Sequence, residues 1–173
     1  MTMVMTIVLI FRSDTNPFFG VSYPSPSMWE IKVPLENKLL LENKIAIVVG
    51  GGQTPGETIG NGRATAILFA REGAKVAVAD RLLSSAEETV KLIVAEGFEA
   101  FAYELDVRDE DGIKNLVSTV VQKWGRIDIL HNNVGVSIAG QDASVEKITP
   151  EGFDNMVAIN LRSMVLTSKH VLP

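Results

Sequence analysis

The chain has 173 residues, a formal net charge of −5 and no cysteine. This length suits one domain with a sizeable core, and a hydrophobic content of 46% is not that of a disordered chain. The lack of a Lys and Arg cluster argues against nucleic-acid binding. The lack of cysteine excludes disulfides and thiolate metal sites, and the two histidines are not at metal-ligand spacing. We therefore expect a cytoplasmic protein without a metal site.

The N-terminal 40 residues lack the periodicity of a folded element. An apolar run at residues 3–11 is shorter than the roughly 20 residues that span a bilayer, and it has no good signal-peptide flanks. The following stretch contains four prolines, Pro17, Pro24, Pro26 and Pro34. We predict an irregular extension over residues 1–40, one folded domain over residues 41–173, and no membrane partner.

Short apolar runs begin at Lys44 and recur at regular intervals. They predict four strands, within residues 44–49, 75–80, 99–107 and 126–135.

Helical patterns lie between these strands, over residues 63–72, 84–96 and 113–124, and each is closed by a glycine. Ser84 with Glu87, or Ser85 with Glu88, predicts a capping box for the second helix. Thr149 followed by Pro150 predicts the start of a last helix over residues 150–172.

This alternation predicts an α/β fold, a doubly wound parallel sheet of the Rossmann type. Ligands of such sheets bind beyond the carboxyl ends of the strands. The candidate site therefore comprises the segments that follow each strand, which are residues 50–62, 80–81, 106–107 and 132–135.

The glycine-rich stretch VVGGGQTPGETIGNGRATA, residues 48–66, follows the first strand. It contains no G-x-G-x-x-G, and it nearly fits a P-loop at residues 51–58 except that Glu57 replaces the phosphate-facing Lys. Two interpretations stay open: a tight turn alone, or a phosphate loop in which Gly50, Gly60 and Gly62 allow close approach.

Asp80 ends the second strand, eighteen residues after Gly62. A carboxylate there can accept hydrogen bonds from the adenosine ribose and would repel a 2′-phosphate, which favours NAD over NADP. Arg81 beside it softens that preference. A solvated strand-end carboxylate is the alternative interpretation of Asp80.

These features together resemble the short-chain dehydrogenase/reductase family. Its T-G-x-x-x-G-x-G turn is similar to Val49-Gly50 and Gly60-Asn61-Gly62, except that Val49 replaces the Thr and six more residues lie between Gly50 and Gly60 than in the family pattern. The resemblance covers residues 41–173. Three later segments match the family in order: Asp106-Val107 resembles its adenine-contacting pair, Asn132-Asn133-Val134-Gly135 its Asn-Asn-Ala-Gly turn, and Asn160 its active-site Asn.

The resemblance implies an NAD(P)-dependent oxidoreductase that transfers hydride between nicotinamide and an alcohol or carbonyl substrate. The family's active-site Tyr is followed four residues later by Lys, whereas Tyr23 is followed by Ser27 and Tyr103 by Val107. We therefore expect the cofactor-binding part of such an enzyme.

The family's strand order implies a sheet that is incomplete on its C-terminal side, with residues 127–130 as an open edge. The alternative function is a non-catalytic dinucleotide-binding or subunit-interaction module. Residues 150–172 are the expected contact of a homo-oligomer, because this helix pairs with its counterpart in many members of the family.

Overall fold

The structure is a computed structural model that describes residues 7–10, 39–53, 56, 58–137 and 143–172. Its sheet has five strands in the order β1-β5-β2-β3-β4. Neighbouring strands among β2 to β5 are parallel, and β1 runs antiparallel to β5. The predicted doubly wound α/β fold is confirmed. The strands are β1 (Ile7–Ile10), β2 (Ile45–Val49), β3 (Lys75–Asp80), β4 (Ala100–Glu104) and β5 (Ile129–Asn132).

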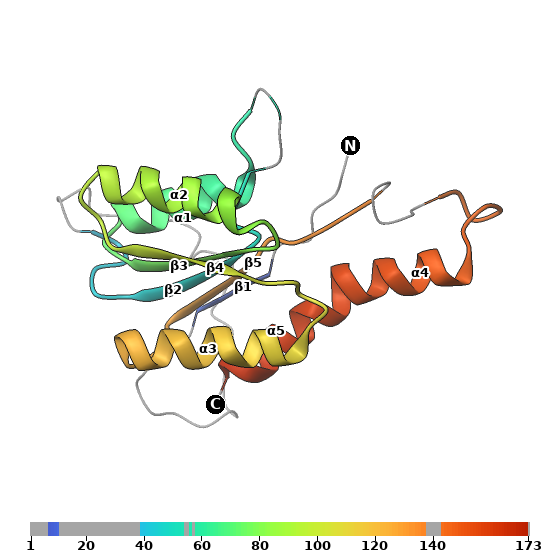
Figure 1. The fold of residues 1–173 in the computed structure, drawn as a ribbon. Coiled ribbons are helices and arrows are strands. Elements are labelled where there is room, and N and C mark those ends of the chain that lie inside the picture. The colour runs from blue at the N-terminus through green and yellow to red at the C-terminus, as the bar shows by residue number, and fades with distance from the viewer. Residues whose placement is uncertain (1–6, 11–38, 54–55, 57, 138–142, 173) are drawn as a thin grey trace, which may run out of the picture.

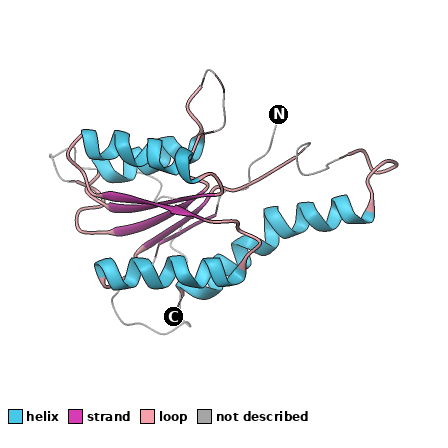
Figure 2. Cartoon of the chain, in the orientation of Figure 1, coloured by secondary structure: helices cyan, strands magenta, loops and turns pink. Residues whose placement is uncertain are grey.

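Helices cover both faces of the sheet (Figures 1 and 2). One face carries α1 (Asn61–Arg71) and α2 (Leu83–Ala95), and the other carries α3 (Glu110–Trp124) and α5 (Ser163–Val171). All five residues of β2 are buried, with Ile45, Ile47 and Val49 in the core beneath α3 and α5. Burial of both faces explains why the strands read as continuous apolar runs.

The two helices on the α3 face are joined by an ionic contact at Glu110. Lys169 Nζ donates to Glu110 Oε1 at 2.9 Å, and His170 Nε2 lies 2.8 Å from the same oxygen. These two contacts, that of Lys169 first, lower the pKa of Glu110 to about 2. The carboxylate is therefore charged at neutral pH and binds α5 to the first turn of α3.

The start of α2 differs from the prediction. Its N-cap is Leu82, which offers no side-chain hydrogen bond, so the predicted capping box at Ser84 or Ser85 is wrong. The Ser85 hydroxyl instead contacts the backbone of Gln53 in the glycine loop.

The N-terminal residues also differ from the prediction at β1. Ile7 lies opposite Asn132 and Ile10 opposite Ile129, so β5 is paired on its outer side, including residues 129–130 of the edge that we expected to be open. Residues 7–10 are correspondingly a strand and not irregular. An apolar, β-branched segment satisfies the free backbone groups of the edge strand. Residues 1–6 and 11–38 of the predicted extension lie outside the described part of the chain.

The last helix is interrupted. Thr149 accepts from Gly152 N as the predicted N-cap, and α4 (Pro150–Val157) follows. A π-helical segment, Ala158–Arg162, then joins α4 to α5. The prediction of one helix over residues 150–172 is correct in extent and misses this change of winding. In the described part of the chain, no helix has the length and apolar character that crossing a membrane requires.

Candidate functional site

A pocket opens where the carboxyl ends of the parallel strands meet. Its volume is about 530 Å³, within the range of roughly 300–1,000 Å³ of small-molecule sites. The topology brings the turns after four strands to this one place. Eleven of the predicted residues line it: Gly50, Gly60, Asn61, Gly62, Asp80, Arg81, Asp106, Val107, Asn133, Val134 and Gly135.

The floor of the pocket is a close approach of three backbone segments. Gly50 has a φ of +80°, which favours glycine. A Cβ on Gly62 would lie 1.9 Å from Gly50 O and 2.7 Å from Asn133 Nδ2. Asn133 Nδ2 itself donates to Gly50 O at 3.1 Å. No side chain fits at Gly62, so the start of α1 contacts the end of β2 directly.

The first turn of α1 presents backbone donors to the pocket. Gly60, Asn61 and Gly62 line it, and Gly60 N donates to Gln53 Oε1 at 2.7 Å. The N–H groups of Asn61 and Gly62 have no acceptor among the described residues, as is normal for the first turn of a helix. Free N–H groups at a helix N-terminus form a site for anions, phosphate groups in particular.

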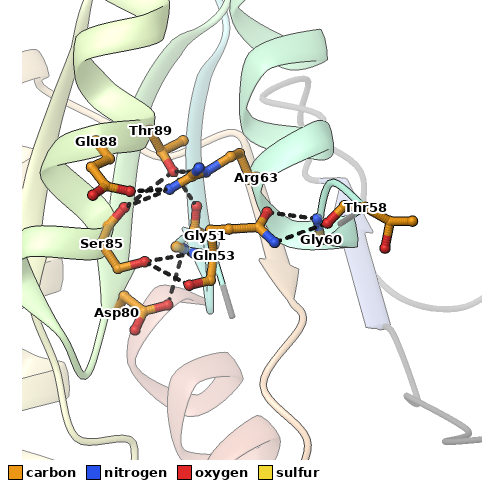
Figure 3. Close-up of polar contacts among 10 residues, drawn as sticks. Gly51, Gln53, Thr58, Gly60, Arg63, Asp80, Ser85, Glu88 and Thr89 are labelled. Atoms are coloured by element: carbon orange, nitrogen blue, oxygen red, sulfur yellow. Dashed lines mark hydrogen bonds and ion pairs between the residues drawn. The ribbon is translucent and has the colours of Figure 1, made fainter. Parts of the chain in front are cut away.

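Asp80 contacts the beginning of the glycine loop, whereas Gly60 lies at its end (Figure 3). Its Oδ2 accepts from Gly52 N at 2.9 Å and its Oδ1 accepts from Leu82 N at 3.1 Å. These bonds fix the orientation of the carboxylate, and Asp80 lines the pocket. Asp80 is the residue that we predicted to bind the ribose.

The glycine loop is also bonded to α2. Thr89 is fully buried, and its hydroxyl donates to Gly51 O at 2.9 Å. Arg63 Nε donates to Thr89 Oγ1 at 3.0 Å, and an Nη of Arg63 donates to Glu88 at 3.0 Å. Sequence reasoning missed this network. The residues involved have no motif of their own, and their contacts depend on the path of the loop.

Asp106 carries a contact that the sequence analysis did not consider. Arg108 Nε lies 3.0 Å from Asp106 Oδ1, and Arg108 Nη2 lies 2.5 Å from Oδ2. The guanidinium hydrogen bonds hold the pKa of Asp106 below its usual value. The Asp-x-Arg spacing at a strand end is the signal that could have found Arg108, which also lines the pocket.

Asn132 is the one predicted cofactor-binding residue that does not line the pocket. It is 3% exposed, and its Oδ1 accepts from Thr167 Oγ1 of α5 at 2.9 Å. Asn132 is the last residue of β5 and its side chain bonds to α5, whereas Asn133 follows the strand and its side chain bonds to Gly50 O. Asn132 therefore packs the sheet against α5.

The next residue, Asn133, passes a test of fit for a bound ligand. Its Oδ1 is buried and has no hydrogen-bond partner in the part of the chain that is described. A buried acceptor without a donor is unfavourable by about 1–3 kcal/mol, and a ligand at the pocket can relieve that. The unpaired Oδ1 of Asn133 and the close contact of Gly62 with Gly50 are compatible with a ligand that binds against the backbone.

Asn160 lies within the π-helical segment, beside the pocket. Its Oδ1 accepts from Val136 N and its Nδ2 donates to Val136 O, both at 2.8 Å. Both polar atoms of the amide are thus used to hold the segment that follows β5. Val136 and Ile159, the neighbours of this contact, line the pocket, whereas Asn160 does not. π-helical turns of this kind occur frequently at functional sites.

Comparison with known proteins gives consistent results. Residues 44–173 match the family model described as short chain dehydrogenase. An uncharacterized oxidoreductase of Bacillus subtilis, YxbG, is 38% identical over 133 residues, which are 77% of this chain and 46% of that protein. The 3-oxoacyl-acyl-carrier-protein reductase FabG of Thermotoga maritima is 36% identical over 77% of this chain and 50% of its own length.

Solved structures resemble the chain in the same way. A short-chain dehydrogenase/reductase from Burkholderia xenovorans superposes with a TM-score of 0.71 at 37% identity, over 77% of this chain and 51% of that one. The chain thus spans about half the length of the relatives that it matches.

Proposed function

Because the chain belongs to the short-chain dehydrogenase family, we propose that it is the dinucleotide-binding part of an NAD-dependent oxidoreductase. The whole protein then transfers hydride between nicotinamide and the carbinol or carbonyl carbon of a small-molecule substrate. One observation carries the proposal: the donors of α1 and the carboxylate of Asp80 line the same pocket. A bound nicotinamide would supply the hydride chemistry, and the chain would bind and orient it.

Different residues of the pocket would bind different parts of the dinucleotide. The N–H groups of Asn61 and Gly62 would bind the pyrophosphate, and Asp80 would accept hydrogen bonds from the adenosine ribose. Asp106 and Val107 would contact adenine, as the family resemblance implies.

The segment after β5 would form the other end of the site. Val134 and Gly135 line the pocket on this side. We assign Asn160 to the active site by the resemblance of its helix, and its two bonds to Val136 give it a positioning role.

Asp80 is the basis for proposing NAD in preference to NADP. We expect Asp80→Ala to weaken NAD binding by roughly tenfold, because hydrogen bonds to a charged group contribute about 1.5–3 kcal/mol. NADP binding should improve relative to NAD, because a carboxylate no longer faces the 2′-phosphate. Isothermal titration calorimetry with both dinucleotides measures the two changes.

The matched control is Asp154→Ala, which removes an exposed carboxylate of α4 that does not line the pocket. It should leave both affinities unchanged. An Asp80→Ala chain with the NAD to NADP selectivity of the wild type would refute the ribose role.

A second candidate function, subunit association, is favoured by the surface of the last helices. Phe153, Leu161 and Val165 are 57%, 51% and 59% exposed at helical spacing. Figure 1 shows α4 extending away from the sheet. We expect Leu161→Glu to lower the mass of any oligomer in analytical ultracentrifugation. An unchanged sedimentation profile for an oligomeric wild type would argue against this face as the contact.

A further inference from the structure

Gln53 joins α2 to the far end of the glycine loop, directly before α1. Its backbone is bonded to α2: Gln53 N donates to Ser85 Oγ at 2.6 Å, and Ser85 Oγ donates back to Gln53 O at 3.1 Å. Its side chain reaches the other end of the glycine loop. There Oε1 accepts from Gly60 N at 2.7 Å, and Nε2 donates to Thr58 O at 3.0 Å (Figure 3).

The side-chain contacts lie directly before the donors of α1. Gly60 is the N-cap residue of α1, and Asn61 and Gly62 follow it. A shift of Gly60 would therefore move the N–H groups of Asn61 and Gly62. Both of these side-chain contacts use main-chain atoms of the loop, one a donor and one an acceptor. A neutral amide matches that pair, because it carries a donor and an acceptor on one planar group.

The loop is long, and the contacts that hold α1 itself, those of Gly62 with Gly50 and of Arg63 with α2, begin only after Gly60. Nine residues separate Gly50 from Gly60, too many for a tight turn alone to fix the second glycine relative to the first. Other bonds to β3 and α2 hold the beginning of the loop, at Gly51 and Gly52. Among the described residues, Gln53 is the side chain whose hydrogen bonds connect this fixed beginning of the loop to residues 58–60.

We infer that Gln53 is a positioning residue for the pyrophosphate of the dinucleotide. It does so without contacting the phosphates: its amide holds Gly60 and Thr58 so that the first turn of α1 keeps its free N–H groups in the pocket. The inference rests on the proposed dinucleotide binding and adds to it the residue that compensates for the extended loop.

The test compares ligands with and without a pyrophosphate on the 173-residue chain. Gln53→Met keeps the length of the side chain and removes both hydrogen bonds. We expect its Kd for NAD and for ADP-ribose to rise about tenfold, since each lost bond contributes a few-fold in affinity. The Kd for adenosine, measured by NMR titration, should change less than about twofold. Thr58→Ala is the matched control, because Gln53 bonds to the main-chain oxygen of Thr58.

Thermal melting by circular dichroism accompanies each titration, so that a folding defect is not mistaken for a binding effect. An equal loss for adenosine and ADP-ribose, or no loss for either, overturns the inference. Tighter NAD binding by Gln53→Met also overturns it, because the amide would then be competing with phosphate for Gly60 N. A wild-type chain that binds neither NAD nor NADP overturns the proposed function, and it is recognised before any substitution is compared.

Discussion

Buried polar groups are treated in opposite ways on the two sides of the pocket. On the α2 side, Thr89 and Ser85 are buried and their hydroxyls bond to the glycine loop. On the β5 side, four buried side-chain atoms lack a partner in the described part of the chain. They belong to the consecutive residues His131, Asn132 and Asn133.

On the α2 side the buried hydroxyls are paired, whereas on the β5 side Asn132 and Asn133 each pair one side-chain atom and leave the other without a partner in the described part of the chain. A paired network in a buried site fixes one conformation, and each unpaired atom is unfavourable by about 1–3 kcal/mol. Among the residues that the structure describes, neither nitrogen of His131 has a hydrogen-bond partner, and the ring packs edge-on against Phe69 with 6.0 Å between centroids. We conclude that the α2 side is preformed for binding. The unpaired polar atoms of β5 and of Asn133 lower the stability of the fold, so stability alone does not explain their presence.

The largest expected effect comes where the two sides meet, at Gly62. Gly62→Ala would bring a Cβ within 1.9 Å of Gly50 O, and backbone lies on both sides of the contact. We expect the free energy of unfolding to fall by about 3 kcal/mol and NAD binding to be lost. Urea denaturation and calorimetry measure the two effects.

Gly60→Ala is the control for Gly62, because a Cβ there meets its nearest atom, Gln53 Oε1, at an ordinary 3.4 Å. Its stability should stay within about 1 kcal/mol of the wild type. Equal stability of the two variants would show that α1 and β2 are not in the close contact described.

A smaller loss is expected on the α2 side from Thr89→Val. Valine keeps the shape and removes the hydroxyl, so that Gly51 O loses its donor and Arg63 Nε its acceptor. We expect the free energy of unfolding to fall by about 2 kcal/mol. Thr119→Val on α3 is the comparison, since its hydroxyl donates to Asn115 O of its own helix. A loss at Thr89 no larger than at Thr119 would remove the contrast between the two sides.

The smallest effect, of opposite sign, is expected on the β5 side from His131→Phe. Burial lowers the pKa of His131, so the folded state takes up a proton less readily than the unfolded state. Stability contributed in this way is present above the unfolded pKa, near 6.5, and is lost as pH falls below it.

His131→Phe should remove that acid sensitivity and raise the free energy of unfolding by about 1 kcal/mol at pH 7. Urea denaturation between pH 7 and 5 gives the slope. The control His170→Phe breaks a contact with Glu110 and should not raise stability. A wild-type slope retained in His131→Phe would mean that another group causes it.

Local periodicity was enough to predict the parallel strands and the helices between them. The strand ends then predicted the pocket, because a parallel sheet brings those ends together whatever the loops do. Asn132 was assigned to the pocket by motif, and its contact with Thr167 of α5 joins segments too distant in the sequence for the motif to show.

Contacts between distant segments could not be predicted in this way. The bridge from Gln53 to Gly60 depends on the path of an extended loop, and the hydroxyl of Ser85 suited a helix cap equally well by sequence. The π-helical segment Ala158–Arg162 leaves the apolar pattern of the helix continuous, so its signal is the tertiary contact of Asn160 with Val136.

Because β5 pairs with β1 on one side and with β2 on the other, its backbone amides are of two kinds, those directed at β1 and those directed at β2. Ile7 pairs with Asn132, so β1 joins a partner far away in the sequence through only four residues. We expect such a contact to form late in folding and to open locally at low free energy. In native-state hydrogen exchange, the β5 amides directed at β1 should exchange by release of that strand alone. Those directed at β2 should exchange only when the parallel sheet itself opens.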